Sequence, residues 1–126
     1  MLHKIFIVDD DQFSGQMLTD YLSDNKMYDV VQINTGKECI DRLHESPDVV
    51  ILDYHLDAVA KDSDNGLAIL EKIKKVNNKT HVIMLSGQMH YGVAAKTIAK
   101  GAEQYVVKDE EAFKNIGLIL KDLVKN

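Results

Sequence analysis

Short apolar runs separated by polar segments dominate the hydrophobic pattern of this chain. The clearest run, Val-Val-Ile-Leu at residues 49–52, follows closely on Pro47, the only proline. A run this short and this rich in β-branched residues predicts a strand buried on both faces, as at the centre of a parallel sheet. Comparable runs predict four further strands, and the five expected strands cover residues 3–8, 28–33, 49–53, 81–85 and 104–107.

Between the strands, apolar residues recur at the three- and four-residue spacing of amphipathic helices. Thr35 and Glu38 fit a capping box, in which the side chain of Thr35 caps the backbone and that of Glu38 reaches back to it. Gly101 is well placed as a left-handed C-terminal cap. The expected helices cover about residues 12–22, a segment behind Thr35 that ends at Ser46-Pro47, residues 67–73 with an end at Asn77-Asn78, residues 93–99, and about residues 110–124.

Strands that alternate with helices form successive βα units, whose right-handed crossovers put helices on both faces of a parallel sheet. We therefore expect an α/β fold: a doubly wound five-stranded parallel sheet with five helices, in the flavodoxin-like strand order 2-1-3-4-5. The length of 126 residues suits one domain, residues 1–126. Small side chains dominate the helix at residues 93–99, so we expect it to be comparatively mobile and to serve as a docking surface.

Composition and charge narrow the class of protein. No apolar run approaches the roughly 20 residues of a membrane-spanning helix. The N-terminal residues turn acidic after one short strand, which is unlike a signal peptide. The net charge of −5, with no basic cluster beyond Lys74-Lys75, disfavours direct binding to nucleic acid. The single cysteine, Cys39, cannot form an internal disulfide. These features indicate a cytoplasmic protein that acts on neither membranes nor nucleic acid.

Chemically capable side chains follow four of the predicted strands. Asp9 and Asp10 follow the first strand, Asp53 ends the third, Ser86 follows the fourth and Lys108 follows the fifth. Ligands of open α/β sheets bind outside the carboxyl ends of the strands. We therefore expect these five side chains to converge at one end of the sheet, although they lie far apart in the sequence.

This set of side chains favours phosphoryl chemistry. Crowded carboxylates repel one another unless a cation compensates, and a small set of oxygen ligands beside a phosphate suits Mg²⁺ or a similar ion such as Mn²⁺. With the metal bound, Asp53 can stay ionised and attack a phosphorus atom, which gives an aspartyl phosphate. The metal on Asp10, the Lys108 ammonium and the Ser86 hydroxyl would then stabilise the transferred group. The next carboxylate, Asp11, is expected to cap the following helix.

The sequence resembles the response-regulator receiver domain of two-component signalling along essentially its whole length. The motifs that carry the resemblance are I-F-I-V-D-D-D at residues 5–11, V-V-I-L-D at 49–53, V-I-M-L-S-G at 82–87 and G-A-E-Q-Y-V-V-K at 101–108. Each motif alone is weak, but four in the right order are specific. The resemblance implies that the family's acidic pair is Asp9 and Asp10, its phosphoacceptor Asp53, its switch hydroxyl Ser86 and its lysine Lys108.

The resemblance implies further roles around this set. The backbone carbonyl of His55 would contact Mg²⁺, and Asp9 would reach the metal through water. Tyr105 falls on the aromatic switch position, where it would turn inward as Ser86 moves toward the phosphate. The alternative that Tyr105 is an ordinary strand residue stays open. His55 and Gln88, two positions beyond the phosphoacceptor and beyond Ser86, are expected to set the rate of dephosphorylation together.

The chain departs from the family pattern at three places. Leu56-Asp57 stand where the family often has Met-Pro. The loop from Asp53 to Gly66 is about five residues longer than is usual for the family, and loops of this kind often carry contacts with partner proteins. We expect this acidic loop to be solvated and mobile, and it lacks the ligand spacing of a calcium loop. Lys108 is followed by Asp109 in place of proline, which leaves the isomer of that peptide bond open.

These expectations favour a receiver that accepts a phosphoryl group on Asp53 from a histidine kinase or a histidine phosphotransfer protein. The face made by the fourth helix, fifth strand and fifth helix would then change its affinity for a downstream protein target, and the chain would be a monomer or weak dimer. It is not expected to be a conventional enzyme, because its chemistry is confined to phosphorylation and autodephosphorylation of Asp53.

Two alternatives stay open. The first is a receiver-like module that binds protein partners independently of phosphorylation, which the altered residues Asp57 and Asp109 keep in play. The second is an aspartyl-phosphate phosphatase that acts on external substrates. Such an enzyme typically needs a second carboxylate near the nucleophile, whereas Tyr54 and His55 follow Asp53 here.

Overall fold

The centre of the fold is β3 (Val49–Asp53), whose five residues are all buried. The structure is a computed structural model that describes residues 2–56, 65–87 and 89–124. Across those residues it contains five parallel strands in the order β2-β1-β3-β4-β5, as predicted. The remaining strands are β1 (His3–Val8), β2 (Tyr28–Ile33), β4 (His81–Ser86) and β5 (Gln104–Val107). β4 is one residue longer than predicted, so Ser86 is its last residue.

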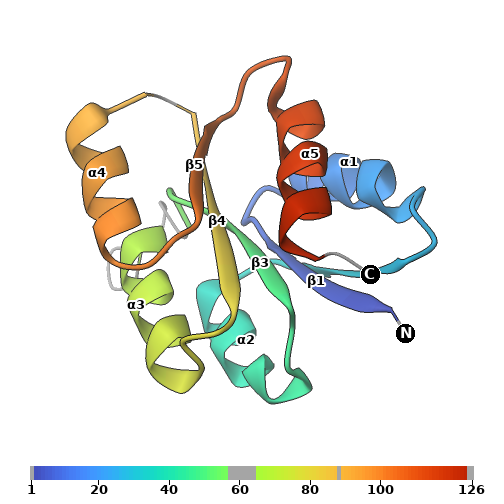
Figure 1. Ribbon diagram of the computed structural model, residues 1–126, viewed down its shortest axis with the longest axis horizontal. Coiled ribbons are helices and arrows are strands. Elements are labelled where there is room, and N and C mark those ends of the chain that lie inside the picture. The colour runs from blue at the N-terminus through green and yellow to red at the C-terminus, as the bar shows by residue number, and fades with distance from the viewer. Residues whose placement is uncertain (1, 57–64, 88, 125–126) are drawn as a thin grey trace.

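Helices cover both faces of the sheet (Figure 1). α1 (Gln12–Ser23) and α5 (Ala112–Leu123) lie on one face, whereas α2 (Gly36–Asp41), α3 (Gly66–Val76) and α4 (Tyr91–Ala99) lie on the other. Side chains alternate along β1, so Ile5 and Ile7 pack with α1 and α5, while Phe6 and Val8 pack with α2 and α3. This two-sided burial confirms the doubly wound architecture. Among the described helices, none has the length and hydropathy that crossing a membrane requires.

Two of the predicted N-terminal caps are present. Asp11 caps α1, and its carboxylate accepts a hydrogen bond from the backbone N–H of Phe13 at 3.0 Å. The hydroxyl of Thr35 caps α2 and accepts from the N–H of Glu38, also at 3.0 Å. The second half of the predicted capping box is wrong, because the Glu38 carboxylate lies 3.5 Å from the guanidinium of Arg42 instead.

The end of α4 also follows the prediction. Gly101 has a φ of 111°, and its N–H donates to the carbonyl of Ile98, while the N–H of Ala102 donates to the carbonyl of Thr97. This pair of bonds is the Schellman motif, whose left-handed position favours glycine. Within α4 itself, Thr97 is the buried residue. The mobility expected of this helix stays a prediction.

The second predicted helix is shorter than expected. α2 ends at Asp41, and a single 3₁₀ turn, η1 (Leu43–Glu45), follows it. Ser46 then adopts the left-handed conformation, with φ 57°, immediately before Pro47. This break in the helix turns the chain toward the start of β3.

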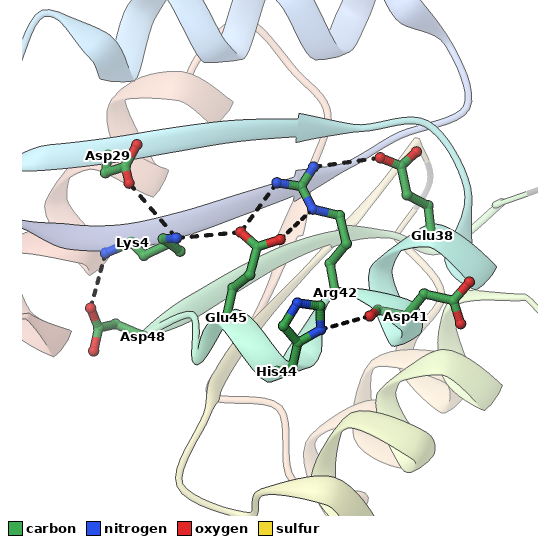
Figure 2. A network of polar contacts seen from close by, with 8 residues as sticks. All are labelled: Lys4, Asp29, Glu38, Asp41, Arg42, His44, Glu45 and Asp48. Carbon is green, nitrogen blue, oxygen red and sulfur yellow. Dashed lines mark hydrogen bonds and ion pairs between the residues drawn. The ribbon is translucent and has the colours of Figure 1, made fainter.

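A network of charged side chains holds the 3₁₀ turn against the sheet (Figure 2). The carboxylate of Glu45 accepts from the Nε of Arg42 at 2.6 Å and from the Nζ of Lys4, on β1, at 3.3 Å. The guanidinium of Arg42 also lies 5.7 Å from the ring centre of Phe6. The hydrogen bond from Arg42, reinforced by Lys4, lowers the pKa of Glu45 to about 2. The bonds from Arg42 and Lys4 to Glu45 therefore stabilise the fold most while Glu45 is ionised.

The apolar residues of α1 divide between the core and the surface. Leu18 and Leu22 are buried against the sheet. Phe13, Met17 and Tyr21 are largely exposed, Phe13 to 73%. The ring of Tyr21 still contacts that of Phe113 on α5, with 5.4 Å between ring centres. The periodicity of these residues therefore predicted the helix correctly but overstated the width of its buried face.

We predict that Glu45→Gln lowers the thermal unfolding temperature by a few degrees at pH 7. Because the pKa of Glu45 is lower in the folded state, its stabilising effect is present above its ordinary pKa of about 4.5 and is lost as the pH falls toward 2. The difference between variant and wild type should therefore shrink across that range. Asp41→Asn, which removes an exposed pair with Lys37, is the control and should change little at any pH. A Glu45→Gln deficit that is equally large at pH 2.5 and pH 7 would contradict this.

Candidate functional site

Four of the predicted site residues lie at the carboxyl ends of neighbouring strands. Asp9 follows β1, Asp53 ends β3, Ser86 ends β4, and Lys108 follows β5. The strands that carry them are adjacent and in register, with Asp53 beside Leu85 and Ser86 beside Val107. The order of the strands is therefore what brings together side chains that are far apart in the sequence.

Three carboxylates form an acidic cluster at this edge. One oxygen from each of Asp9, Asp10 and Asp53 lies within 4.8 Å of the others. Asp9 and Asp53 are each only 4% exposed, whereas Asp10 faces solvent. One oxygen of Asp9 accepts a hydrogen bond from the N–H of Asp11 at 2.9 Å. The cluster is therefore a partly buried, oxygen-only site that opens to solvent through Asp10.

The ammonium group of Lys108 partly neutralises the cluster. Its Nζ lies 3.3 Å from Asp53 Oδ1 and 3.7 Å from Asp9 Oδ2. The backbone N–H of Lys108 donates to the carbonyl of Ser86 at 2.7 Å, which ties the residue to the end of β4. The peptide bond between Lys108 and Asp109 is trans. Three carboxylates and one lysine leave a formal charge of about −2, which suits a hard divalent cation with oxygen ligands.

Burial makes the ionised form of Asp9 unfavourable. Its loss of solvent raises the pKa of Asp9 to about 6, against the lowering effects of the Asp11 N–H and the Lys108 charge. The negative charge of Asp53 raises the pKa further. Lys108 alone therefore does not compensate the carboxylates fully, and a bound cation would favour the ionised form of Asp9.

The other predicted residues occupy different surroundings. The side chain of Ser86 is completely buried, and Tyr105 is half-buried against the core on the α2 and α3 side. His55 is exposed, with its ring edge-on to that of Tyr54 at 5.0 Å between centres. Gln88 and the acidic loop at residues 57–64 lie outside the described residues. The part that His55 and Gln88 would play together is therefore still a prediction.

Sequence reasoning missed two backbone features of this site. The N–H of His55 donates to Asp53 Oδ1 at 3.2 Å, so the residue expected to offer its carbonyl also orients the carboxylate through its amide. Gly66, at the start of α3, lies directly against the backbone of Asp53 and Tyr54. A glycine that opens an amphipathic helix is a weak signal in a sequence, because its neighbours across the fold are not visible there.

The sequence profile of the response regulator receiver domain matches residues 5–118 of this chain. The chain belongs to this family. A chemotaxis protein CheY from Bacillus subtilis is 29% identical over 124 residues, which cover 98% of this chain and 99% of that protein. The BeF3-activated DrrB receiver domain has 26% identity, a TM-score of 0.85 and full coverage of both chains.

Receiver domains similar to this one also occur as parts of longer proteins. A protein-glutamate methylesterase from Methanospirillum hungatei is 27% identical over 129 residues, and the matched region is 36% of its length. The response regulator DrrB of Thermotoga maritima, at 27% identity and a TM-score of 0.82, is covered over 53% of its length. The activities of such longer proteins therefore cannot be assigned to the receiver domain itself.

Proposed function

We propose that this receiver domain accepts a phosphoryl group on Asp53 from the phosphohistidine of a histidine kinase or a histidine phosphotransfer protein. The observation that carries the proposal is the contact of Lys108 with both Asp53 and Asp9, beside a cluster that also includes Asp10. A chance surface lysine would have no reason to reach two nearly buried carboxylates from different strands. The function of the domain is then to report the phosphorylation state of its donor.

In the proposed transfer, an oxygen of the Asp53 carboxylate attacks the phosphorus atom as a nucleophile. A new P–O bond forms while the P–N bond breaks, and the electron pair of that bond stays on the imidazole nitrogen of the donor. A ring protonated at its other nitrogen leaves as neutral histidine. Lys108 balances charge on the phosphoryl oxygens, and the hydroxyl of Ser86 donates a hydrogen bond to one of them.

The acidic cluster fits Mg²⁺ or Mn²⁺, with Asp10 and Asp53 as direct ligands, the backbone carbonyl of His55 as a third, and Asp9 reaching it through water. When bound, the metal would shield the negative charge of the phosphoryl group from the carboxylates. The close approach of the three carboxylates supports this assignment, and burial, which raises the pKa of Asp9 despite the nearby Lys108, means that a bound cation would favour its ionised form.

The proposed output is a change at the face formed by α4, β5 and α5. Ser86 would move toward the phosphoryl group, and Tyr105 would turn further inward to fill the space that it leaves. The half-buried position of Tyr105 is compatible with such a change. A downstream protein target would read the result, because a local change in charge biases a surface with two arrangements.

We predict that a small acyl phosphate and Mg²⁺ add one phosphoryl group to the wild-type chain, and that Asp53→Asn abolishes the gain. The asparagine amide is a far weaker nucleophile than a carboxylate. Intact-mass spectrometry measures the gain, and Asp24→Asn, which removes an exposed carboxylate at the end of α1, is the matched control. A gain that survives Asp53→Asn would refute the assignment. Partner binding that ignores the phosphoryl group would favour the phosphorylation-independent alternative.

We also predict that the double substitution His55→Ala and Gln88→Ala changes the lifetime of the aspartyl phosphate several-fold. Both positions are expected to lie near the path of the attacking water, whereas neither supplies a reacting side chain for the transfer itself. Loss of the phosphoryl group is followed after removal of the donor, and the phosphorylation rate is measured in parallel. An unchanged lifetime would show that these two residues do not tune hydrolysis.

A further inference from the structure

The first residue of α3 lies against the backbone of the phosphoacceptor. An ideal Cβ built on Gly66 would lie 2.6 Å from the carbonyl oxygen of Asp53 and 2.7 Å from the Cα of Tyr54. Real Cβ atoms essentially never approach other heavy atoms to within 3.0 Å. Because these neighbours are backbone atoms, they cannot rotate away as the end of a flexible side chain could. Position 66 therefore has no room for a side chain unless the backbone moves.

Hydrogen bonds hold the same short segment from several sides. The N–H of Gly66 donates to the carbonyl of Tyr54 at 2.9 Å, and the N–H of Tyr54 donates to the carbonyl of Leu85 on β4, also at 2.9 Å. One residue further on, the N–H of His55 donates to the carboxylate of Asp53 at 3.2 Å. The segment that Gly66 touches is therefore the one that orients the Asp53 carboxylate and carries the His55 carbonyl.

The packing of α3 indicates whether this helix or the segment after β3 would move if residue 66 had a side chain. α3 is anchored by Ile69, Leu70 and Ile73, which are all buried. Its first turn is capped by Asn65, whose side chain accepts from the N–H of Ala68 at 3.0 Å. To restore ordinary contact at 3.4 Å, a Cβ at 2.6 Å from the Asp53 oxygen would need a shift of about 0.8 Å. With the helix anchored along its length, that shift falls on the segment after β3.

We propose that Gly66 is a positioning residue for phosphoryl transfer. Because Gly66 lacks a side chain, the start of α3 packs directly against the peptide unit between Asp53 and Tyr54. This contact orients the Asp53 carboxylate and the His55 carbonyl. The inference rests on the proposed function of Asp53. A displacement of about 1 Å at a reacting group is large enough to slow a reaction by roughly 100-fold.

The test compares Gly66→Ala with two controls. Gly92→Ala makes the same change in α4, where no atom lies within 4 Å of the added Cβ. Leu70→Val weakens the packing of α3 without bringing an atom toward the Asp53 backbone. For each folded variant, the rate of phosphorylation by a small acyl phosphate with Mg²⁺ is measured well below its unfolding temperature. The amide resonance of His55 is recorded by NMR in the absence of the phosphodonor.

We expect Gly66→Ala to lower the rate by at least about tenfold and to shift the His55 resonance, while both controls stay within about twofold of wild type. A Gly66→Ala rate equal to that of Gly92→Ala overturns the inference, because α3 would then absorb the added atom. An equal slowing in Leu70→Val also overturns it, because general loosening of α3 would then explain the effect.

Two further measurements keep the test decisive. If Gly66→Ala does not fold, Asn65→Ala releases the first turn of α3 without adding an atom. A transfer several-fold slower than in Leu70→Val, with a shifted His55 resonance, supports the inference, and a rate equal to that of Leu70→Val overturns it. If the wild-type chain takes up no phosphoryl group, the proposed function has failed and the positioning role in phosphoryl transfer fails with it. If the wild type is phosphorylated and Gly66→Ala is phosphorylated at the same rate, the positioning role of Gly66 is wrong and the proposed function of Asp53 stands.

Discussion

The charge balance between Lys108 and the carboxylates at the ends of β1 and β3 is the interaction on which this structure's chemistry depends. Asp9 and Asp53 are almost fully buried, and burial alone makes ionised carboxylates costly. Lys108 reaches both of them, yet the pKa of Asp9 is still raised to about 6. Burial of Asp9 therefore outweighs the charge of Lys108, and a divalent cation at the cluster would favour the ionised carboxylates.

The sheet gives this polar cluster a rigid frame. β3 is buried along its whole length, with β1 beside Val49–Leu52 and β4 beside Val49–Asp53, so the strand that leads to Asp53 is held on both sides up to its last residue. The helices on both faces add the packing that holds those strands. The side chains of the candidate site then lie at the strand ends, where ligands of open α/β sheets bind. Gly66 belongs to the same arrangement, because it lets a helix end contact the site directly.

Much of this arrangement could be predicted from local pattern. The apolar runs identified the strands, and the flavodoxin-like strand order 2-1-3-4-5 expected of a doubly wound sheet brings Asp9, Asp53, Ser86 and Lys108 to one edge. Other features depend on contacts between distant residues, which a linear pattern does not contain. Arg42 and Lys4 draw Glu45 into a network where the expected helix breaks. Three of the five large apolar residues of α1 are exposed. Asp9 and Asp10 are adjacent in sequence, yet one is buried and the other exposed.

The central claim is that the acidic cluster and Lys108 form a single phosphoryl-binding site around Asp53. Titration of the chain with Mg²⁺ and beryllium trifluoride, a stable mimic of a phosphoryl group, tests this most directly by NMR. We predict that the backbone resonances of Asp53, Ser86 and Lys108 shift together, that a change at Tyr105 accompanies them, and that Asp53→Asn removes the response. The absence of binding, or a response confined to residues away from the carboxyl ends of β1, β3, β4 and β5, would contradict it.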